Sequence, residues 1–382
     1  SISCKMLRMN KEGNEMSDSL GIRKYDYVEF YVGSAKMVAY WYAKALGLKI
    51  EGYSGPETGC RDRISYYLTQ NNLKIVITGS LQPSTVDVSN FLNLHGDGLK
   101  RWAMEVDDVE KIFDHAVKQG AVIQRRPQKI ENEHGYITEA AIRLYDDTEL
   151  VYINRDNYKH IFQPGYDKPI QDIQLTSGDA GLIGIDHIVG NVRENEMDKW
   201  ADYYVRTMNF ETFIDFKKGD IGTKYSALLS KVVRSEKSTI KNPINEPYEG
   251  EKKSQIEEYI EQYHGTGVQH IAIQTGDIIH TIRTLRENGV EFLNVPDTYY
   301  DTLRARDDIN IKENIDDLQK LKILCDNESG GYLLQLFTKP IGDRPTFFFE
   351  FIQRAGAQGF GKGNFQALFE AIEEDQELRG NL

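Results

Sequence analysis

The chain contains two pairs of repeated segments, and this duplication restricts its fold more than any other feature of the sequence. In the first pair, YDYVEFYVGSAKMVAYWYAKALGLK at residues 25–49 corresponds to IDHIVGNVRENEMDKWADYYVRTMNFE at residues 185–211. In the second pair, residues 95–123 correspond without a gap to residues 264–292. Every copy has the pattern of a short strand, a turn and an amphipathic helix.

The helix of the second pair ends at a glycine in both copies, Gly120 and Gly289, as expected where a chain leaves a helix in the left-handed conformation. Further strands should follow the helices, because residues 63–79 and 137–155 read as hairpins with polar turns. The sequence therefore predicts four βαβββ modules, two in each half. We expect an α+β fold in which these modules pair into two open-barrel domains.

The boundaries of the two domains follow from changes in composition along the chain. Residues 163–184 are rich in Pro, Gly, Asp and Gln and are predicted to link an N-terminal domain (22–162) to a C-terminal catalytic domain (185–382). A length of 382 residues suffices for two domains with separate cores. Residues 1–21 are expected to form a mobile arm, and the acidic segment 294–317 is expected to be irregular.

The charge and cysteine content exclude several classes of partner. The 46 basic and 59 acidic residues give a net charge of −13 without a basic run, so neither nucleic acid nor an anionic membrane is expected to bind. No apolar run is long enough to span a membrane, and the N-terminus lacks a signal-peptide core. Three scattered cysteines without a CxxC pair suit the reducing cytoplasm.

The two halves differ where chemistry is expected. The second half has His187 and His270 where the first half has Tyr27 and Arg101. A single histidine in an apolar strand is usually a core residue with a satisfied hydrogen bond. Two histidines at equivalent positions of paired modules, both in the same half, instead favour a pair of metal ligands.

A carboxylate lies in the middle of the apolar stretch PTFFFEFIQR, at Glu350. An ionised carboxylate removed from water without partners costs several kcal/mol, so Glu350 must be paired, be protonated or bind a cation. A salt bridge to Arg344 or Arg354 is the structural explanation, and a metal ion is the functional one.

Equivalent strands of paired modules meet around a pseudo-twofold axis, so we expect His187 and His270 to face each other and Glu350 to reach the same cavity. Two imidazoles and one carboxylate on one side of a metal leave its other side open, as in non-haem Fe(II) oxygenases. Zinc with an activated water is an alternative for the same three ligands.

These residues belong to motifs that resemble the 4-hydroxyphenylpyruvate dioxygenase family, which has the glyoxalase-like vicinal oxygen chelate fold. The motifs are IDHIVGNV, KSQIEEY, GVQHIAI, FFFEFIQR, GFGKGNFQALFEAI and the terminal RGNL, and the resemblance extends from about residue 22 to the end. It implies that His187, His270 and Glu350 bind one Fe(II) per subunit, with dioxygen as co-substrate.

The resemblance also implies residues that contact or orient the substrate. Its polar catalytic positions fall on Ser230, Asn245, Gln255, Gln269 and Gln335. Its substrate-binding positions fall on Pro243, Phe337, Phe348, Phe360, Asn364 and Phe365. Each has a structural explanation as well: Asn364 can cap the terminal helix, Gln255 and Ser230 can lie on an outer face, and Phe337 and Phe348 can be core residues.

The implied reaction converts 4-hydroxyphenylpyruvate and dioxygen to homogentisate and carbon dioxide by oxidative decarboxylation, ring hydroxylation and side-chain migration, within tyrosine and phenylalanine catabolism. The resemblance implies a homodimer or a homotetramer. The glycines of GFGKGNF, Gly359, Gly361 and Gly363, are interpreted as a hinge for a C-terminal helix over the active site rather than as a phosphate loop.

Three alternatives are retained at this point. A 4-hydroxymandelate synthase would share the fold and ligands, but Pro243, Asn245 and Phe337 match the dioxygenase pattern. An extradiol catechol dioxygenase is expected to have further histidine and tyrosine acid-base residues, and His264 and His280 do not form such a set. A metal-free binding module of the same fold has no reason to keep two histidines and a buried carboxylate in one half.

Overall fold

The computed structural model of the chain describes residues 17–169, 178–217, 219–223, 227–248, 250–328 and 330–381. Most of the predicted arm, residues 1–16, and the middle of the predicted linker, residues 170–177, lie outside the described residues. The end of the predicted arm is packed against the protein, because Ser17 and Leu20 are each only 6% exposed.

The described residues of the first half fold as eight strands and three α-helices. Its strands are β1 (Ile22–Tyr31), β2 (Lys49–Ser54), β3 (Arg63–Gln70), β4 (Leu73–Ser80), β5 (Gly98–Val106), β6 (Ile123–Asn132), β7 (Gly135–Leu144) and β8 (Thr148–Asn154). Its α-helices are α2 (Ala35–Leu46), α3 (Val86–His95) and α4 (Val109–Lys118), with a single 3-10 turn, η1 (Pro56–Thr58), after β2.

The second half repeats this order of strands and has additional helices between its fifth and sixth strands and after its eighth strand. Its strands are β9 (Leu182–Asn191), β10 (Glu211–Phe216), β11 (Ala227–Arg234), β12 (Lys241–Tyr248), β13 (Gly267–Thr275), β14 (Leu324–Glu328), β15 (Gly331–Phe337) and β16 (Phe348–Ala355). Its helices are α5 (Met197–Met208), α6 (Gln255–Tyr263), α7 (Ile278–Glu287), α8 (Asp297–Arg304), α9 (Ile315–Leu321) and α10 (Lys362–Leu378).

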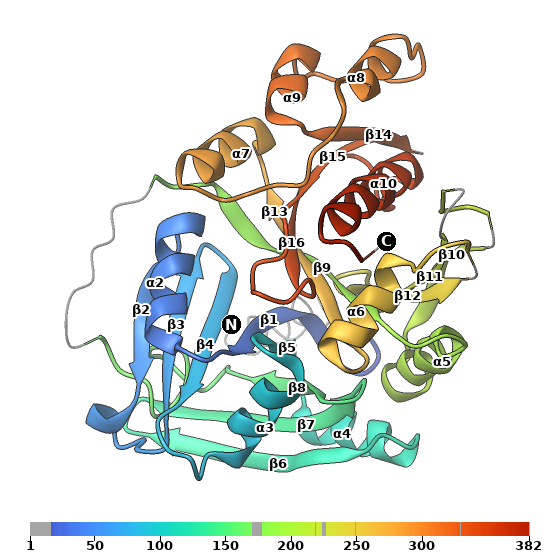
Figure 1. Cartoon of the computed structure of the whole chain (residues 1–382). Helices are drawn as coiled ribbons and strands as arrows, with labels where there is room; N and C mark the ends of the chain where they lie inside the picture. The colour runs from blue at the N-terminus through green and yellow to red at the C-terminus, as the bar shows by residue number, and fades with distance from the viewer. Residues whose placement is uncertain are drawn as a thin grey trace, which may run out of the picture.

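Each half forms one curled sheet, and the two sheets have the same strand order (Figure 1). The first is β2-β3-β4-β1-β5-β8-β7-β6, and the second is β10-β11-β12-β9-β13-β16-β15-β14. In both sheets the middle pair, β1 with β5 or β9 with β13, is antiparallel and joins two βαβββ modules. The predicted α+β fold with four modules in two open barrels is therefore confirmed.

Equivalent helices in the two halves begin and end in the same way. Asp108 accepts a hydrogen bond from the backbone N–H of Lys111 at the start of α4, and Asp277 accepts one from the N–H of His280 at the start of α7. Beyond the same helices, Gly120 and Gly289 both have φ of +94°, so the glycines occupy the left-handed conformation as predicted.

Helices lie where the sequence analysis expected none. The segment 294–317 is not irregular throughout, because α8 lies inside it and α9 begins near its end. Tyr300 and Leu303 of α8 are buried, and Tyr300 donates a hydrogen bond to the carbonyl of Ile323 over 3.0 Å. The prediction was wrong because two buried side chains, rather than a long apolar stripe, hold this helix in place.

The largest hydrophobic cluster among the described residues contains side chains of both halves, which differs from the separate cores expected for two domains. Phe30 of β1 lies 4.9 Å from Phe347 between ring centroids and 6.3 Å from Phe349 of β16. Tyr42 of α2 contacts Phe349 from the same side at 5.8 Å. As the alternation of a strand requires, this core takes the side chain of Phe349, which leaves its neighbour Glu350 on the concave face of the second sheet.

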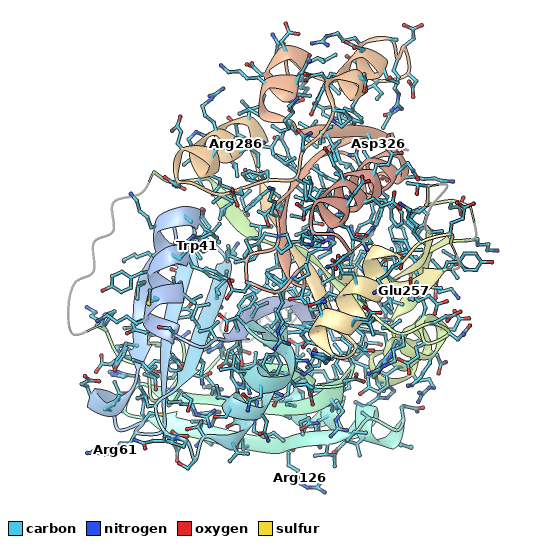
Figure 2. The ribbon with its side chains drawn as sticks, in the orientation of Figure 1. Trp41, Arg61, Arg126, Glu257, Arg286 and Asp326 are labelled. Carbon is cyan, nitrogen blue, oxygen red and sulfur yellow. The ribbon has the colours of Figure 1, made fainter. Side chains whose placement is uncertain are left out.

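Charged side chains lie mostly on the outside of both halves (Figure 2), where Arg61 and Arg126 project from the first half and Glu257 from α6. Among the helices described, none combines the length and the apolar composition that crossing a bilayer requires.

Candidate metal centre

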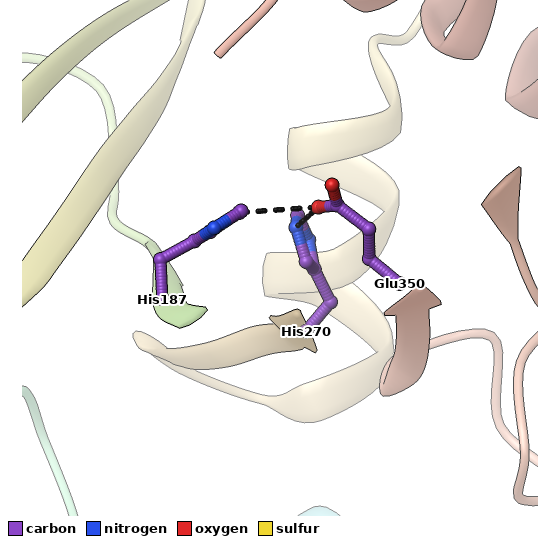
Figure 3. A group of neighbouring side chains, drawn as sticks. All are labelled: His187, His270 and Glu350. Atoms are coloured by element: carbon purple, nitrogen blue, oxygen red, sulfur yellow. Dashed lines mark hydrogen bonds and ion pairs between the residues drawn. The ribbon is translucent and has the colours of Figure 1, made fainter. Parts of the chain in front are cut away.

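Three side chains from three strands meet on the concave face of the second sheet (Figure 3). Oε2 of Glu350 lies 3.1 Å from Nε2 of His187 and 3.1 Å from Nε2 of His270. One ligand atom from each of these residues lies within 4.8 Å of the others, and all three residues are buried. The fold therefore brings together the two histidines that the repeat singled out and the carboxylate predicted from the apolar stretch around Glu350.

The register of the strands explains this meeting. Ala272 of β13 lies opposite His187 of β9 on one side and opposite Glu350 of β16 on the other. Its small side chain leaves space between the two ligands, and His270 lies two residues earlier on the same strand. The pairing of β13 with β9 is irregular between Val268 and His270, an arrangement that re-aims side chains beside many active sites.

Each histidine is oriented by its other ring nitrogen. Nδ1 of His187 lies 2.7 Å from Oδ1 of Asp186, and Nδ1 of His270 lies 2.9 Å from Oε1 of Gln269. Both neighbouring oxygens accept hydrogen bonds, so they keep a proton on Nδ1 of each ring and direct Nε2 toward the centre. Such outer partners are typical of histidines that bind metals.

The structural explanation for Glu350, an ion pair with an arginine, does not hold. Arg354 pairs instead with Asp186, at 2.8 Å, and Arg344 donates to backbone carbonyls. Apart from the two histidines, the described residues supply Glu350 with one further hydrogen bond, which Nε2 of Gln335 donates to Oε1 over 2.7 Å. The carboxylate thus presents Oε2 to the histidines.

The electrostatics of the group keep the carboxylate ionised. Burial by itself raises the pKa of Glu350, but the adjacent imidazoles of His187 and His270 outweigh burial and lower the pKa to about 2. Burial lowers the pKa of His187, yet Glu350 and Asp186 on either side of the ring outweigh it and raise the pKa. A cation is thus favoured between these side chains, and a metal ion can take the place of the proton.

The donor set therefore fits a divalent metal ion. It offers two imidazole nitrogens and one carboxylate oxygen, all on one side, and the side chains opposite them are apolar. The cavity beside the three ligands is completed by Gln335, Phe337, Phe360, Phe365 and Leu368. Among the described residues that complete this cavity, only Gln335 is polar, and its side chain is already bound to Glu350 and Asn364, so a metal held here would keep positions open for substrate.

Aromatic rings predicted as substrate contacts surround the ligands. Phe348 stacks on His270 with 4.8 Å between centroids and 20° between planes, and Phe337 meets His270 edge-on at 6.0 Å. Phe360 meets His187 edge-on at 4.8 Å. Phe360 and Phe365 come from the start of α10 and the loop before it, so this terminal helix covers the cavity.

The predicted polar residues fall into three groups. Gln335 contacts Glu350 directly, and Asn364 donates from Nδ2 to Oε1 of Gln335 over 2.8 Å. Gln269 lies beside His270 and, together with Gln255, lines a second cavity between α6 and α10. Asn364 accepts a hydrogen bond from Tyr299 as well, so it joins a network and does not cap α10.

Ser230 and Asn245 lie farther along the same sheet, paired across β11 and β12, with Pro243 two residues before Asn245. Both polar side chains are buried. Within the described residues, Ser230 Oγ and Asn245 Oδ1 have no hydrogen-bond partner, and neither has Nδ2 of the adjacent Asn191. Buried polar atoms without partners are costly and rare, so this group is suited to a polar group of a ligand.

The sequence analysis missed Asp186, Asn191 and the role of Arg354. Asp186 directly precedes a candidate ligand, so the Asp-His pair could have indicated an oriented histidine. Asn191 is four residues after His187 and lies on the same face of the strand. Arg354 was considered only as a partner of Glu350, because nothing in the sequence connects it with Asp186, 168 residues away.

In the first half, the positions equivalent to the two histidines have different contacts. Arg101 pairs with Glu29 at 2.5 Å and with Glu149 at 3.0 Å. Tyr27 packs edge-on against Phe162, a residue of the segment that follows β8, at 5.1 Å. Ionic and aromatic contacts thus occupy the region that corresponds to the histidines of the second half.

The chain is similar to a known protein superfamily and to individual proteins. Residues 24–149 and 184–310 match the Glyoxalase/Bleomycin resistance protein/Dioxygenase superfamily. The 4-hydroxyphenylpyruvate dioxygenase of Yarrowia lipolytica is 43% identical over 96% of this chain and 96% of its own, and that of Xenopus tropicalis is 43% identical over 94% of this chain and 92% of its own. Among solved structures, a mutant 4-hydroxymandelate synthase from Streptomyces coelicolor has a TM-score of 0.83 at 28% identity, and the match covers 93% of this chain and 99% of that one.

Proposed function

The chain belongs to the 4-hydroxyphenylpyruvate dioxygenase family of the glyoxalase/bleomycin resistance protein/dioxygenase superfamily, and from this premise we propose that it converts 4-hydroxyphenylpyruvate and dioxygen to homogentisate and carbon dioxide. The observation that carries the proposal is the buried group of His187, His270 and Glu350. This donor set and its one-sided geometry match a non-haem Fe(II) oxygenase site.

Fe(II) is the metal we propose for this site, one ion per subunit. When bound, it would supply the electrons that activate dioxygen and the coordination positions for the 2-oxo acid group of the substrate. The protein holds its three ligand atoms in place through Asp186, Gln269 and Gln335, which orient His187, His270 and Glu350 in that order.

The aromatic residues have a different role in the proposed reaction. Phe337, Phe348, Phe360 and Phe365 offer flat hydrocarbon surfaces that hold the phenol ring of the substrate and exclude water. Their side chains have neither an exchangeable proton nor an oxidisable polar group. The oxidising steps are therefore directed to the substrate rather than to the protein.

The polar group of Asn191, Ser230 and Asn245 supports a substrate that carries a hydroxyl as well as a carboxylate. The amide of Asn245 donates to Oδ1 of Asn191 over 3.4 Å, which leaves one donor and one acceptor unused. If the side-chain amides of Asn191 and Asn245 are both rotated by a half turn, one donor and one acceptor again have no partner among the described residues. A group that both donates and accepts, such as a phenol hydroxyl, satisfies them, whereas a carboxylate only accepts.

The remaining parts of the proposal concern the state of the protein in the cell. We propose that it acts in tyrosine and phenylalanine catabolism as a cytoplasmic homodimer or homotetramer. The unpaired Cys60 and Cys325 support a reducing compartment. The domain limits 22–162 and 185–382, joined by residues 163–184, are proposed as well, with the first half as a duplicate without metal whose Arg101 cluster stands at the equivalent positions.

The test is anaerobic reconstitution with Fe(II), addition of 4-hydroxyphenylpyruvate, exposure to air and chromatographic identification of the product. Homogentisate from the wild-type protein, absent with Glu350→Ala, is the expected result. Reconstitution with Zn(II) in parallel should give no product, because zinc has no accessible redox change. The variant Glu287→Ala, which removes an exposed carboxylate at the end of α7, serves as the control for charge loss.

Other products would change the conclusion in defined ways. Hydroxymandelate in place of homogentisate would make the protein a 4-hydroxymandelate synthase. It would then be the interpretation of the cavity wall around Asn245 and Phe337, and not that of the metal site, that is wrong. An absence of both bound iron and turnover would overturn the proposed metal site itself.

A further inference from the structure

The side chain of Arg354 contacts two parts of the site: the carboxylate of Asp186, which orients the ligand His187, and the loop that leads into α10. The guanidinium of Arg354, at the end of β16, binds Asp186 with two parallel hydrogen bonds of 2.8 Å, from Nε and Nη2. Asp186 in turn orients His187 over 2.7 Å. The guanidinium of Arg354 thus fixes the orientation of the Asp186 carboxylate, which in turn fixes the orientation of His187.

The third nitrogen of the same guanidinium is directed to the loop before α10. Nη1 of Arg354 donates to the carbonyl oxygen of Gly359 over 2.6 Å and to that of Ala357 over 3.3 Å. We name residues 357–361 the hinge loop. Because an arginine donates in a fixed plane, the carboxylate and the hinge loop cannot move independently while both contacts persist.

The hinge loop is held on its opposite side by a carboxylate. Glu328, at the end of β14, accepts from the N–H of Gly359 over 2.7 Å and from the N–H of Gly361 over 2.6 Å. Asp326, labelled in Figure 2 on the same strand, accepts from the N–H of Gly363 over 2.7 Å. The contact with Glu328 accounts for the glycine at position 359, since a Cβ there would lie 2.4 Å from Oε2 of Glu328.

A second connection joins α10 to the metal site by a separate route. Asn364, in the first turn of α10, donates to Gln335, which donates to Glu350. The hinge loop and α10, which cover the cavity, are thus linked to two of the three ligands by chains of hydrogen bonds. The hinge loop is linked to His187 through Arg354 and Asp186, and α10 is linked to Glu350 through Gln335. The hinge loop also contributes Phe360, which packs edge-on against His187.

We propose that Arg354 is a positioning residue that couples the orientation of His187 to the placement of the hinge loop, so that metal binding and closure of this loop stabilise each other. Such coupling is reciprocal, because a metal that binds the closed form more tightly favours closure by the same factor. The inference rests on the metal site of the proposed function and adds a residue that contacts neither metal nor substrate.

The experiment uses the full-length protein without substrate or dioxygen turnover, with Co(II) as the probe metal. Two quantities are measured: the affinity for Co(II), from its visible absorption, and hydrogen exchange of residues 355–365 with and without Co(II). In the wild-type protein Co(II) should slow exchange in the hinge loop. Arg354→Gln should weaken Co(II) binding by about 10–100-fold, the usual effect of losing an outer partner of a ligand, and should abolish the slowing of exchange.

Two further variants and one control variant keep the test decisive. Arg354→Lys retains the positive charge but cannot bind carboxylate and loop with one planar fork, so it should fold and still lose most of the coupling. Asp186→Asn should weaken Co(II) binding while exchange of the metal-free hinge loop stays close to wild type, because Arg354 keeps its contacts with Ala357 and Gly359. Arg193→Gln breaks a similar two-bond pair with Asp146, at 2.7 and 3.2 Å, and should change neither quantity.

The outcomes separate the inference from the proposed function. A folded Arg354→Gln or Arg354→Lys protein that binds Co(II) as tightly as the wild type would overturn the role of Arg354 and leave the metal site intact. Unchanged exchange in the wild-type hinge loop on adding Co(II) would do the same. A wild-type protein that binds no Co(II) would instead overturn the metal site, and with it both proposals.

Discussion

Gln335 donates a hydrogen bond of 2.7 Å to Oε1 of Glu350, and this contact turns the other carboxylate oxygen toward both histidines. The two residues lie on neighbouring strands, β15 and β16, where Glu350 is opposite Phe337 and Gln335 is one diagonal step away. A buried carboxylate is thus held by one neutral donor, and the remaining oxygen is free to bind a cation.

Replacement of Gln335 by leucine should weaken metal binding. Oε1 of Glu350 would lose its donor and Asn364 its acceptor, so the carboxylate could rotate away from His187 and His270. We expect a loss of about 10–100-fold in Fe(II) or Co(II) affinity, measured by titration of the metal-free protein. Gln82→Leu, at an exposed position of the first half, is the control, and equal affinities for the two variants would contradict the orienting role of Gln335.

Addition of a divalent metal should stabilise the protein against heat. Binding to the folded state alone stabilises it by about 2.7 kcal/mol when the free metal is at 100 times its Kd. The melting temperature of the metal-free protein should therefore rise with Co(II) concentration. In Glu350→Ala, with only two imidazoles left, the rise should be much smaller, and an undiminished rise would place the metal elsewhere.

The opposite face of β16 should control stability rather than metal binding. Phe349 is fully buried and packs on Phe347 at 5.0 Å and on Tyr42 of the first half at 5.8 Å. Phe349→Ala should cost about 3–5 kcal/mol in the free energy of unfolding, measured by urea denaturation. The exposed Met37 provides the control in Met37→Ala, which should change stability by less than about 0.5 kcal/mol.

A buried ion cluster in the first half should give the protein part of its acid sensitivity. Asp26 is buried between Arg155, at 2.8 Å, and Lys74, at 2.7 Å. Burial by itself raises the pKa of Asp26, but the two cations outweigh it and the pKa lies below the usual value of 3.8. The stabilisation is therefore complete above the unfolded pKa, near 4, and is lost as the pH falls through that value toward the lower folded pKa.

The substitution Asp26→Asn tests this predicted loss of stability in acid. At pH 7 it leaves Arg155 and Lys74 without their carboxylate and should cost about 3–5 kcal/mol, as for other broken buried pairs. Because the wild-type protein loses its advantage in acid, the difference between the two proteins should shrink below pH 4. Urea denaturation at pH 7, 5 and 3 measures it, and a constant difference across this range would contradict the assignment.

The internal repeat and the apolar strand around Glu350 made the fold and the ligand set predictable from the sequence. The hydrogen bonds that orient the ligands could not be predicted. His187 and His270 stood out because the first half has Tyr27 and Arg101 in their places, and Glu350 stood out because a strand core rarely holds a carboxylate. The pairing of Asp186 with Arg354 depends on how β9 and the end of β16 meet, which no local pattern encodes. Helix α8 was missed for a similar reason, since only the folded chain shows Tyr300 and Leu303 to be buried.

The glycine at position 359 offers the last test, because its lack of a side chain is required by contact with Glu328. A methyl group there would lie 2.4 Å from Oε2 and 2.5 Å from Oε1 of this carboxylate, so Glu328 must move away and release the N–H groups of Gly359 and Gly361. Glu328 is half-buried at the end of a strand and its side chain can rotate, so the protein should still fold.

Gly359→Ala should consequently lower kcat/KM by about 10-fold or more, equivalent to about 1.4 kcal/mol of lost transition-state stabilisation, while its melting temperature stays close to wild type. Gly342→Ala is the matched control, because a methyl group at Gly342 meets no atom within 4 Å. The double variant Gly359→Ala, Glu328→Ala separates the two causes: recovery of kcat/KM would assign the loss to the clash, and continued loss would assign it to the missing hydrogen bonds. Wild-type kcat/KM in Gly359→Ala would show that the placement of the hinge loop does not limit turnover.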